Sequence, residues 1–329
     1  MGRLKQMVIL GSLILVLVFG ILIILNPTLQ GLVIGLPPPP QESGNWSLHF
    51  CPRENCMAFL DDALETGSKV ECALYSINLY NTTHILEEKR ALVFVDNSTM
   101  PASYKEAVPL VVPGLMNHKF CVLDNDIVTT GSFNPTFQSN NQDNNNLFII
   151  SSPYLAQNYA AEMEFLAGKD VATPYPRVMH DGFLIENYFC PRDGCEGHIL
   201  DAMGQAKKSV YFMEYTFTSS PIEDELVSLH RNGVAVEGII EKFQSANKGT
   251  YTFLSRSGID ILWDGNPKLM YHKVMIIDNN TVVFGSFDPT VASNTINREN
   301  VLIIHNPEIA AKFLEEYVFV KEQAQKATN

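Results

Sequence analysis

The strongest constraint on the fold of this 329-residue chain is that most of it is repeated. The block FCPRENC at Phe50–Cys56 returns as FCPRDGC at Phe189–Cys195, 139 residues later. A longer block, Asn117–Thr136, returns at Tyr271–Thr290, 154 residues later. The second copy is therefore longer by 15 residues, and both copies are much longer than a solenoid repeat. The repeat predicts two domain-sized halves related by a pseudo-two-fold axis, with any shared site between them.

Within each copy, short apolar runs alternate with helical patterns, which indicates α/β halves with mixed sheets flanked by helices. In the second copy we expect strands at 209–215, 234–240, 273–278 and 281–284, and helices at 221–231 and 307 to about 321. The corresponding region of the first copy, 77–113, is abbreviated. We therefore expect its peripheral helices to be shortened or missing.

The N-terminus carries an uncharged run of 19 residues, Met7–Leu25, close to the roughly 20 that a membrane-spanning helix needs. A cleavable signal peptide is the alternative, but its apolar core is usually roughly 7–15 residues and precedes a small-residue cleavage site. The run is longer and no such site follows, which favours a retained anchor. Because Arg3 and Lys5 precede it, we expect a cytoplasmic tail and an extracytoplasmic folded domain, at a cell surface or in an organelle lumen.

Four prolines, Pro37–Pro40, follow the anchor and favour an extended stalk. The expected organisation is a tail and anchor at 1–25, a proline-rich stalk at 26–44, and two halves at 45–170 and 171–329. Four glycosylation sequons fit an extracytoplasmic location, at Asn45, Asn81, Asn97 and Asn279.

The charge of the chain limits its partners. The formal net charge is −13, and residues 1–40 contribute +2, so the remainder carries −15. A general nucleic-acid coat protein needs a basic footprint, which is absent. Long-range attraction of polyanions is therefore weak, and any phosphate binding must be local.

The repeated block follows the pattern K-x4-D-x6-G-S-x-[ND]. Its members are Lys119, Asp124, Gly131, Ser132 and Asn134 in the first copy, and Lys273, Asp278, Gly285, Ser286 and Asp288 in the second. Two lysines brought together by a pseudo-dyad make a compact cationic site that suits phosphate, and serine and asparagine side chains can donate to phosphate oxygens. A single copy is typical of a surface hairpin with a Gly-Ser turn. Two copies with identical spacing favour a shared phosphate site.

This block resembles the signature of the phospholipase D superfamily, H-x-K-x4-D-x6-G-S-x-N in duplicate, and the resemblance covers nearly all of residues 45–325. It implies two halves packed with their sheets together and one active site between them. In that family one histidine attacks phosphorus and the other protonates the leaving alcohol, while the lysines, serines and asparagines stabilise the phosphoryl charge. The resemblance implies no metal and no cofactor, and a monomeric pseudo-dimer.

The chain departs from the family where the chemistry is most demanding. The histidine positions hold Asn117 and Tyr271, and Asn117 is neither a nucleophile nor a general acid. His118 and His272 precede the lysines by one residue, so on a strand they face away from a pocket that Lys119 faces. Tyr271 could attack phosphorus only if its phenol, with an ordinary pKa near about 10, were activated.

We therefore assign candidate roles by position. Asp288 puts a negative charge where phosphate should bind, unless it is protonated or paired. By resemblance, Glu299 is the candidate for the residue that orients a histidine, and Asn145 takes its place in the first copy. The candidate catalytic residues are Lys119, Lys273, Tyr271 and Asn117; the candidate phosphate ligands are Ser132, Asn134, Ser286 and Asp288; and the candidate supporting residues are Asp124, Asp278, Glu299, His118 and His272.

Six cysteines leave a structural choice open. Cys51/Cys56 and Cys190/Cys195 could form one local disulfide in each half, a four-cysteine zinc site joining the halves, or free thiols; an exported domain favours the disulfides. Cys72 aligns with Phe212 and Cys121 with Met275, so we expect both to be buried thiols.

Two functions remain compatible with the sequence. One is a membrane-anchored phosphodiesterase of the phospholipase D type, catalytically impaired, with a lipid or a nucleic acid as substrate. The other is a non-catalytic relative that binds a phosphorylated ligand or a protein at the membrane surface. The missing histidines favour the second function on chemical grounds, whereas the resemblance favours the first.

Overall fold

A computed structural model describes residues 38–102 and 104–328 of the chain. The expected anchor at 7–25 and most of the expected stalk at 26–44 lie outside the described residues. No helix among the residues that are described is both long and apolar enough to cross a membrane. Residues 42–329 form one unit that contains both halves.

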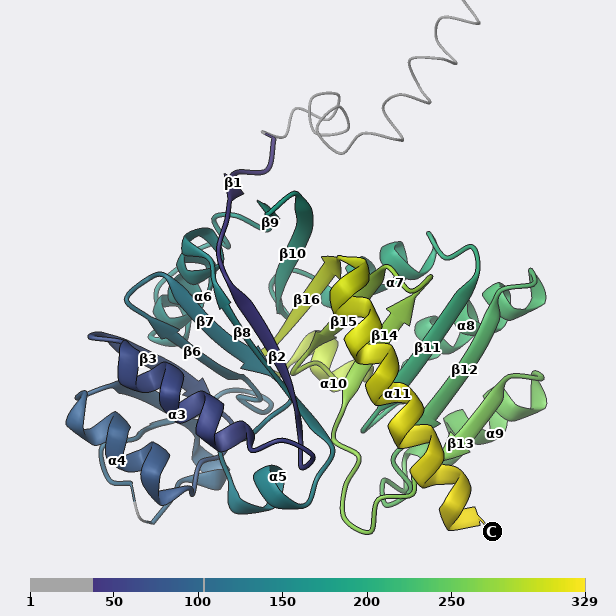
Figure 1. Ribbon diagram of the computed structural model, residues 1–329, viewed down its shortest axis with the longest axis horizontal. Coiled ribbons are helices and arrows are strands. Elements are labelled where there is room, and N and C mark those ends of the chain that lie inside the picture. Colours follow the sequence, from purple (N-terminus) through teal and green to yellow (C-terminus); the bar gives the residue numbers. More distant parts are fainter. Residues whose placement is uncertain (1–37, 103, 329) are drawn as a thin grey trace, which may run out of the picture. The chain divides into compact units, whose positions relative to one another are not determined.

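The first half builds a mixed seven-stranded sheet with the order β2-β8-β7-β6-β3-β4-β5 (Figure 1). Strands β3, β4 and β5 are parallel, and the other pairs are antiparallel. The strands are β2 (Trp46–Cys51), β3 (Val70–Leu74), β4 (Leu92–Asp96), β5 (Val108–Leu110), β6 (Lys119–Leu123), β7 (Ile127–Gly131) and β8 (Asn145–Ser151). The helices are α3 (Cys56–Thr66), α4 (Tyr80–Glu88), the 3-10 turn η1 (Asn97–Thr99), α5 (Phe137–Asn141) and α6 (Pro153–Leu166).

The second half builds a nine-stranded sheet, β1-β9-β10-β16-β15-β14-β11-β12-β13, whose last seven strands repeat the order of the first sheet. The strands are β1 (Gln41–Glu42), β9 (Arg177–His180), β10 (Phe183–Cys190), β11 (Ser209–Glu214), β12 (Ala235–Ile240), β13 (Asp260–Trp263), β14 (Lys273–Ile277), β15 (Thr281–Gly285) and β16 (Glu299–His305). The helices are α7 (Cys195–Met203), α8 (Ser220–Arg231), α9 (Asn247–Arg256), α10 (Val291–Thr295) and α11 (Pro307–Thr328).

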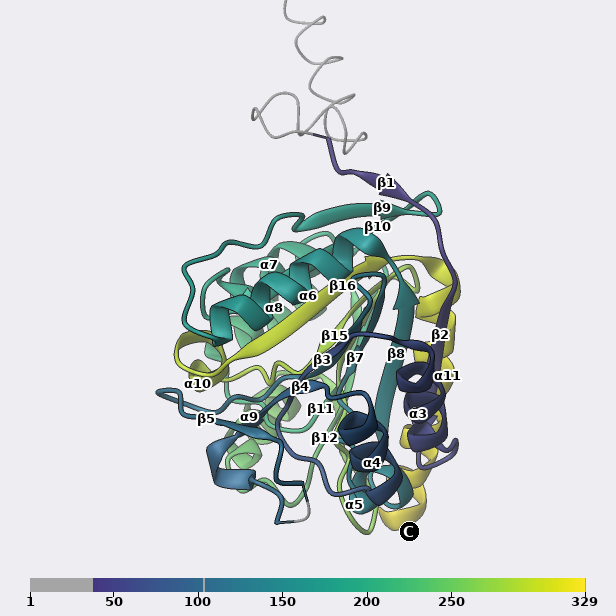
Figure 2. The same cartoon turned by 90° about the vertical axis from the view of Figure 1, so that its left-hand side faces the viewer.

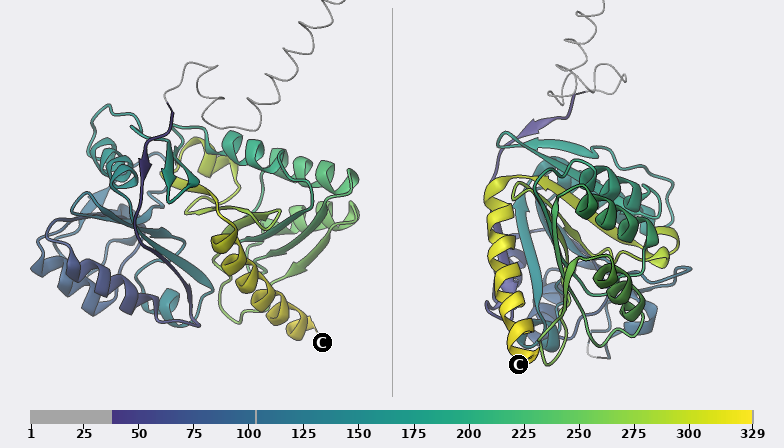
Figure 3. Two further views of the ribbon diagram at one scale, coloured as in Figure 1. Left: turned by 45° about the horizontal axis from the view of Figure 1, so that its top comes forward. Right: turned by 90° about the vertical axis from the view of Figure 1, so that its right-hand side faces the viewer.

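The two halves share a central core. Side chains from both sheets meet there, among them Phe120 and Phe148 from the first and Phe284 from the second, together with Tyr159 of α6 and Phe313 of α11. Each sheet has its own outer layer of helices, α3 and α4 in one half and α7, α8 and α9 in the other (Figures 1 and 3). Because each sheet is covered on both faces, its strands are apolar on both sides, as the continuous apolar runs in the sequence require.

The expected strands and helices of the second half are present, with α8 one residue longer at its start and α11 extending to Thr328. In the first half the expected shortening is found in part. Helix α4 has 9 residues where α8 has 12, and the turn η1 follows β4 where α9 follows β12. The first half therefore retains the equivalent of α8 as the shorter helix α4, and it has the turn η1 in place of α9.

The cysteines form three disulfides. Cys51 bonds to Cys56 and Cys190 to Cys195, each linking the end of a strand to the first turn of a helix. The structure therefore contains the local disulfides rather than the zinc alternative. The expectation of free thiols at Cys72 and Cys121 was wrong. These residues lie directly opposite each other on β3 and β6 with Cα atoms 4.1 Å apart, and they form the third disulfide.

Candidate functional site

The site lies where the two halves exchange backbone hydrogen bonds. The amide of Asn117 donates to the carbonyl of Arg298 at 2.9 Å, and the amide of Tyr271 donates to the carbonyl of Asn144 at 2.9 Å. Two residues later each chain segment enters a strand at its lysine, β6 at Lys119 and β14 at Lys273. Each half therefore fixes the position of the residue that precedes the other half's lysine.

Glycines bring the two serines close to the neighbouring strands. Gly131 and Gly285 have φ values of +140° and +153°, and a Cβ on either would overlap the carbonyl oxygen of Asn146 or Asn300. Only glycine adopts this backbone without strain. The serine that follows each glycine is completely buried next to the site.

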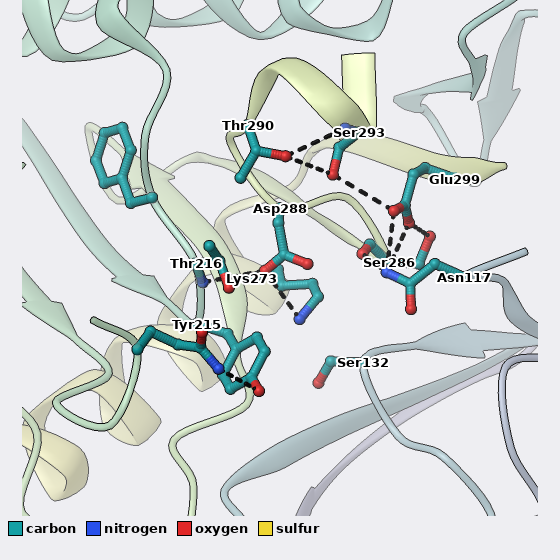
Figure 4. Close-up of polar contacts among 12 residues, drawn as sticks. Asn117, Ser132, Tyr215, Thr216, Lys273, Ser286, Asp288, Thr290, Ser293 and Glu299 are labelled. Atoms are coloured by element: carbon teal, nitrogen blue, oxygen red, sulfur yellow. Dashed lines mark hydrogen bonds and ion pairs between the residues drawn. The ribbon is translucent and has the colours of Figure 1, made fainter. Parts of the chain in front are cut away.

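Asn117 occupies the centre of a hydrogen-bond network on the first-half side of the site. Its Nδ2 donates to Glu299 Oε1 at 2.9 Å and to the carbonyl of Ser286 at 3.2 Å (Figure 4). Its Oδ1 and its carbonyl both accept from Lys119 Nζ at 2.7 Å. Ser286 Oγ donates to the other oxygen of Glu299 at 2.6 Å. The side-chain amide of Asn117 is therefore hydrogen-bonded to both the carboxylate of Glu299 and the ammonium of Lys119.

Lys273 is neutralised within its own half. Its Nζ lies 3.2 Å from Asp288 Oδ1, which also accepts from the backbone amide of Thr216 at 3.1 Å (Figure 4). The ammonium sits over the ring of Tyr271 at 3.9 Å and that of Tyr215 at 4.7 Å. Glu214, at the end of β11, is buried next to it and has an Oε2 without a hydrogen-bond partner among the described residues. The second lysine thus faces two carboxyl groups.

The two halves are unequal in their polar partners. Asn134 stands at the position of Asp288, and its buried Oδ1 has no hydrogen-bond partner among the residues described. Ser132 Oγ accepts from Asn146 Nδ2 at 3.1 Å, whereas its counterpart Ser286 is bound to Glu299. The unused hydrogen-bonding capacity of the site is therefore concentrated on Asn134, Lys273 and Glu214.

Burial and charge shift the protonation of this cluster. Desolvation, together with the nearby Lys273 ammonium, lowers the pKa of Lys119 to about 7. Desolvation raises the pKa of Glu299 to about 7, against the opposing effect of Lys119. Desolvation also raises the pKa of Glu214 and of Tyr271 well above their ordinary values, with Asp288 adding to both. Burial therefore favours the protonated form of Glu214, and Tyr271 is a phenol at neutral pH.

A family model described as "Cardiolipin synthase, PLD-like domain" matches residues 47–166 and matches again at residues 199–318. The chain belongs to the phospholipase D-like family. It is 30% identical over 146 residues to a phospholipase D of Rickettsia typhi, covering 44% of this chain and 69% of that protein. It is 31% identical over 126 residues to a human mitochondrial cardiolipin hydrolase, covering 38% and 50%.

A solved structure shows the same fold over both halves. The phosphatidylserine synthase of Haemophilus influenzae matches 84% of this chain and 86% of its own length, with a TM-score of 0.62 and 13% sequence identity. The pseudo-two-fold architecture of this chain is therefore that of the phospholipase D-like fold.

The two histidines that immediately precede the lysines, His118 and His272, bind carboxylates away from the site. His118 Nε2 lies 3.1 Å from Glu162 of α6, and His272 Nε2 lies 3.0 Å from Glu316 of α11. Both imidazoles are completely buried on the face of the strand opposite the site. The prediction from strand alternation agrees with this placement, and neither histidine replaces the missing ones.

The motif aspartates lie away from the site. Asp124 and Asp278 sit in the turns that follow β6 and β14, at the strand ends opposite the two lysines. Asp124 accepts from the amides of Ser68 and Lys69, and Asp278 accepts from Lys207, Lys208 and Ser209. Asp124 and Asp278 therefore hold the chain that leads into the neighbouring strand, and among the described residues they make no contact with the site lysines.

Several residues of the site were missed by sequence reasoning. Glu214 ends β11 and Tyr215 follows it; that strand carries no motif, so nothing in their local pattern marked them. Outside the site, two ion pairs between the halves were also missed: Arg53 and Arg192, of the repeated C-P-R-x-x-C block, each pair with a glutamate of the opposite half. Those glutamates, Glu162 and Glu316, lie 154 residues apart in the repeat, which was the available signal.

Proposed function

We propose that this chain is a membrane-anchored phospholipase D-like protein that binds a phosphodiester group at the interface of its halves without performing phosphohistidine hydrolysis. The observation that carries the proposal is the placement of Asn117. An amide, which cannot attack phosphorus or donate a proton at neutral pH, stands at one of the two histidine positions and is held by Glu299 and Lys119.

The second half supports the same conclusion. Tyr271 stands at the other histidine position, and the raised pKa of its phenol removes it as a nucleophile at neutral pH. Its ring covers Lys273, so it also blocks one of the two ammonium groups. A phosphodiester bound here would meet Lys119, Asn134 and the serine hydroxyls, with Lys273 available once Tyr271 or Asp288 moves.

The location is part of the proposal. An uncharged run of 19 residues preceded by Arg3 and Lys5 supports a single-pass anchor with the folded domain outside the cytoplasm. Three disulfides in the folded domain support an oxidising compartment. The ligand is then a phosphorylated molecule of a membrane surface or of the surrounding fluid, and the protein acts as a monomer with an internal dyad.

Retained hydrolysis is the competing function, since relatives of this chain are described as a phospholipase D and a mitochondrial cardiolipin hydrolase. The test measures hydrolysis of bis(p-nitrophenyl) phosphate by the full chain in zwitterionic detergent. Binding of dimethyl phosphate is measured in parallel by calorimetry. The variants are Lys119→Ala and the double variant Asn117→His/Tyr271→His.

We expect no hydrolysis by the wild type, saturable binding of dimethyl phosphate, and loss of that binding in Lys119→Ala. Turnover by the wild type that disappears in Lys119→Ala would show that the site is catalytic. Absence of binding in the wild type and in the double variant would exclude the phosphate site. Turnover in the double variant alone would locate the loss of chemistry at the two substituted positions.

A further inference from the structure

Helices α6 and α11 occupy equivalent positions in the two halves but end at different points. They begin at Pro153 and Pro307, 154 residues apart. Helix α6 ends at Leu166, because the chain turns away through Gly168, which has a φ of +90° and donates its amide to the carbonyl of Phe165. Helix α11 continues to Thr328. The second half therefore has two more helical turns at this place.

Those extra turns fill a groove in the second half. Helix α11 packs across β11, β12 and β13, and its backbone lies so close to Gly265 that a Cβ there would overlap the carbonyl of Gln323. Asn144 Nδ2 donates to Gln323 Oε1 at 3.3 Å, and Asn144 also accepts from Asn266. The groove between the β13–β14 segment and the helix end is thereby closed and its polar groups are satisfied.

The equivalent groove in the first half is open. A hollow of about 430 Å³ lies between the segment that follows β5 and the end of α6; both elements are labelled in Figure 2. Val111, at the position of Gly265, is 79% exposed, and Leu166 and Val112 also line the hollow. The repeat thus provides, within one chain, both a filled and an unfilled form of the same groove.

The open groove also contains a cation. Arg298 stands at the position of Asn144, and its guanidinium lies over the ring of Phe165 at 5.2 Å. No carboxylate among the described residues forms an ion pair with it, although Asp170 lines the same hollow. The neighbouring Lys169 is engaged by Glu164 at 3.1 Å. The groove is therefore apolar with a positive end, and it suits an apolar segment that carries a negative charge.

We propose that this groove is the docking site for a short amphipathic helix of a partner protein. Its aliphatic residues would face Val111 and Leu166, and a carboxylate would face Arg298, as Gln323 faces Asn144 in the filled groove. The helix reproduces the last turns of α11, which the first half lacks. The proposal does not rest on phosphate binding, because the guanidinium of Arg298 lies over Phe165 in the groove, whereas the carboxylate of Glu299 is bonded to Asn117 and Ser286 in the site.

The probe is a fluorescein-labelled helical peptide with the sequence of residues 317–328, in which Gln323 is replaced by Glu. Its binding to the full chain is measured by fluorescence anisotropy. We expect saturable binding that weakens at least about tenfold in Arg298→Glu, because a salt bridge becomes a like-charge contact. The control Arg256→Glu makes the same charge change on α9, away from the groove, and should leave binding unchanged.

A second peptide, with Lys in place of Gln323, should bind Arg298→Glu better than it binds the wild type. This charge reversal distinguishes docking from partial unfolding, and equal melting temperatures of the three proteins check the fold directly. Absence of saturable binding overturns the proposal, as does equal weakening by Arg298→Glu and Arg256→Glu. So does a dimer in sedimentation that Arg298→Glu dissociates, since the occupant would then be a second copy of the chain.

Discussion

Asn117 and Tyr271 differ in how they alter the site. The amide keeps the network intact by bonding to both Glu299 and Lys119, so the first half retains the arrangement in which a histidine could be oriented. The phenol instead covers an ammonium with an apolar ring. Asn117 only removes the reactive imidazole, whereas Tyr271 also restricts the access of a phosphate group to Lys273.

Removing the ring of Tyr271 tests that restriction. In Tyr271→Ala the ammonium of Lys273 loses a cation–π contact and gains space in front of it. We expect affinity for dimethyl phosphate to rise about threefold to tenfold, measured by calorimetry. Tyr251→Ala removes a tyrosine that stacks on Trp263, away from the lysines, and should leave affinity unchanged. A fall in affinity in Tyr271→Ala would show that the phenol is itself a ligand.

The protonation of Lys119 and Glu299 predicts a pH dependence. The pKa of Lys119 is lowered to about 7 and that of Glu299 is raised to about 7, so both groups take up protons as the pH falls from 8 to 6. The site becomes more positive, whereas dimethyl phosphate keeps one negative charge. Affinity should therefore rise as the pH falls, by at most about tenfold per pH unit for each proton taken up.

Isothermal calorimetry at several pH values, in buffers of different ionisation enthalpy, measures both the affinity and the proton uptake. Lys119→Met and Glu299→Gln should each remove part of the uptake. Affinity that is constant between pH 6 and 8 would place both groups outside the binding reaction.

At the level of elements, the two C-P-R-x-x-C turns connect the halves. Arg53 reaches Glu316 on α11 and lies over Phe319 at 4.5 Å, while Arg192 pairs with Glu162 on α6 at 2.9 Å. Each glutamate also contacts the histidine that precedes a lysine of the site. A disulfide-closed turn of one half is thereby joined to a helix and a lysine strand of the other.

Breaking one of these bridges should destabilise the fold. In Arg53→Ala the carboxylate of Glu316, which is 0% exposed, loses its cation. We expect a loss of about 1–3 kcal/mol in the free energy of unfolding, because one buried oxygen of Glu316 loses its partner while the other keeps its contact with His272. Urea denaturation measures it, and Arg53→Ala/Glu316→Gln should recover part of the loss. Equal stability of the single variant and the wild type would show that the ion pair makes no net contribution.

The elements show what local sequence patterns can and cannot predict. Strand and helix positions were predicted from apolar runs and capping residues. The two-residue period of a strand predicted that the His118 side chain points away from the site. The pairing of Cys72 with Cys121 was not predicted, because their aligned partners in the other half are Phe212 and Met275. The Arg53–Glu316 pair joins positions 263 residues apart, a separation that no local pattern constrains.

The motif predicted the lysines, the serines and Asn117 of the site, because their spacing was repeated. It did not show that Asp124 and Asp278 lie at the strand ends opposite the lysines, because sequence spacing does not show at which end of a strand a side chain acts. Glu214 and Tyr215 were missed for a different reason. Glu214 ends β11 and Tyr215 follows it. The equivalent residues of the first half are Leu74, which ends β3, and Tyr75, so the acidic residue has no counterpart in the repeat.

At the scale of the whole molecule, the halves depend on a common core. Phe120, Phe148 and Phe284 are almost fully buried among residues of both halves. Separation would expose this apolar surface to water. We expect residues 38–170 and 171–329, produced separately, to aggregate.

Produced together, the two fragments should form a soluble one-to-one complex, as size-exclusion chromatography with light scattering would show. Fragments that are each soluble and monomeric would contradict a shared core. The matched control is the same co-production with Phe284→Asp, which should lower the yield of complex.

The difference between α6 and α11 has a consequence for how such a molecule can change over time. In a dimer of identical subunits every alteration appears twice, so a longer helix on one side is a longer helix on both. When the two copies are joined in one chain, each half can change without the other. One half could close its groove with extra helical turns while the other kept it open, and one half could gain Glu214 while the other kept Leu74. The covalent link thereby converts one duplicated surface into two surfaces that selection can shape separately.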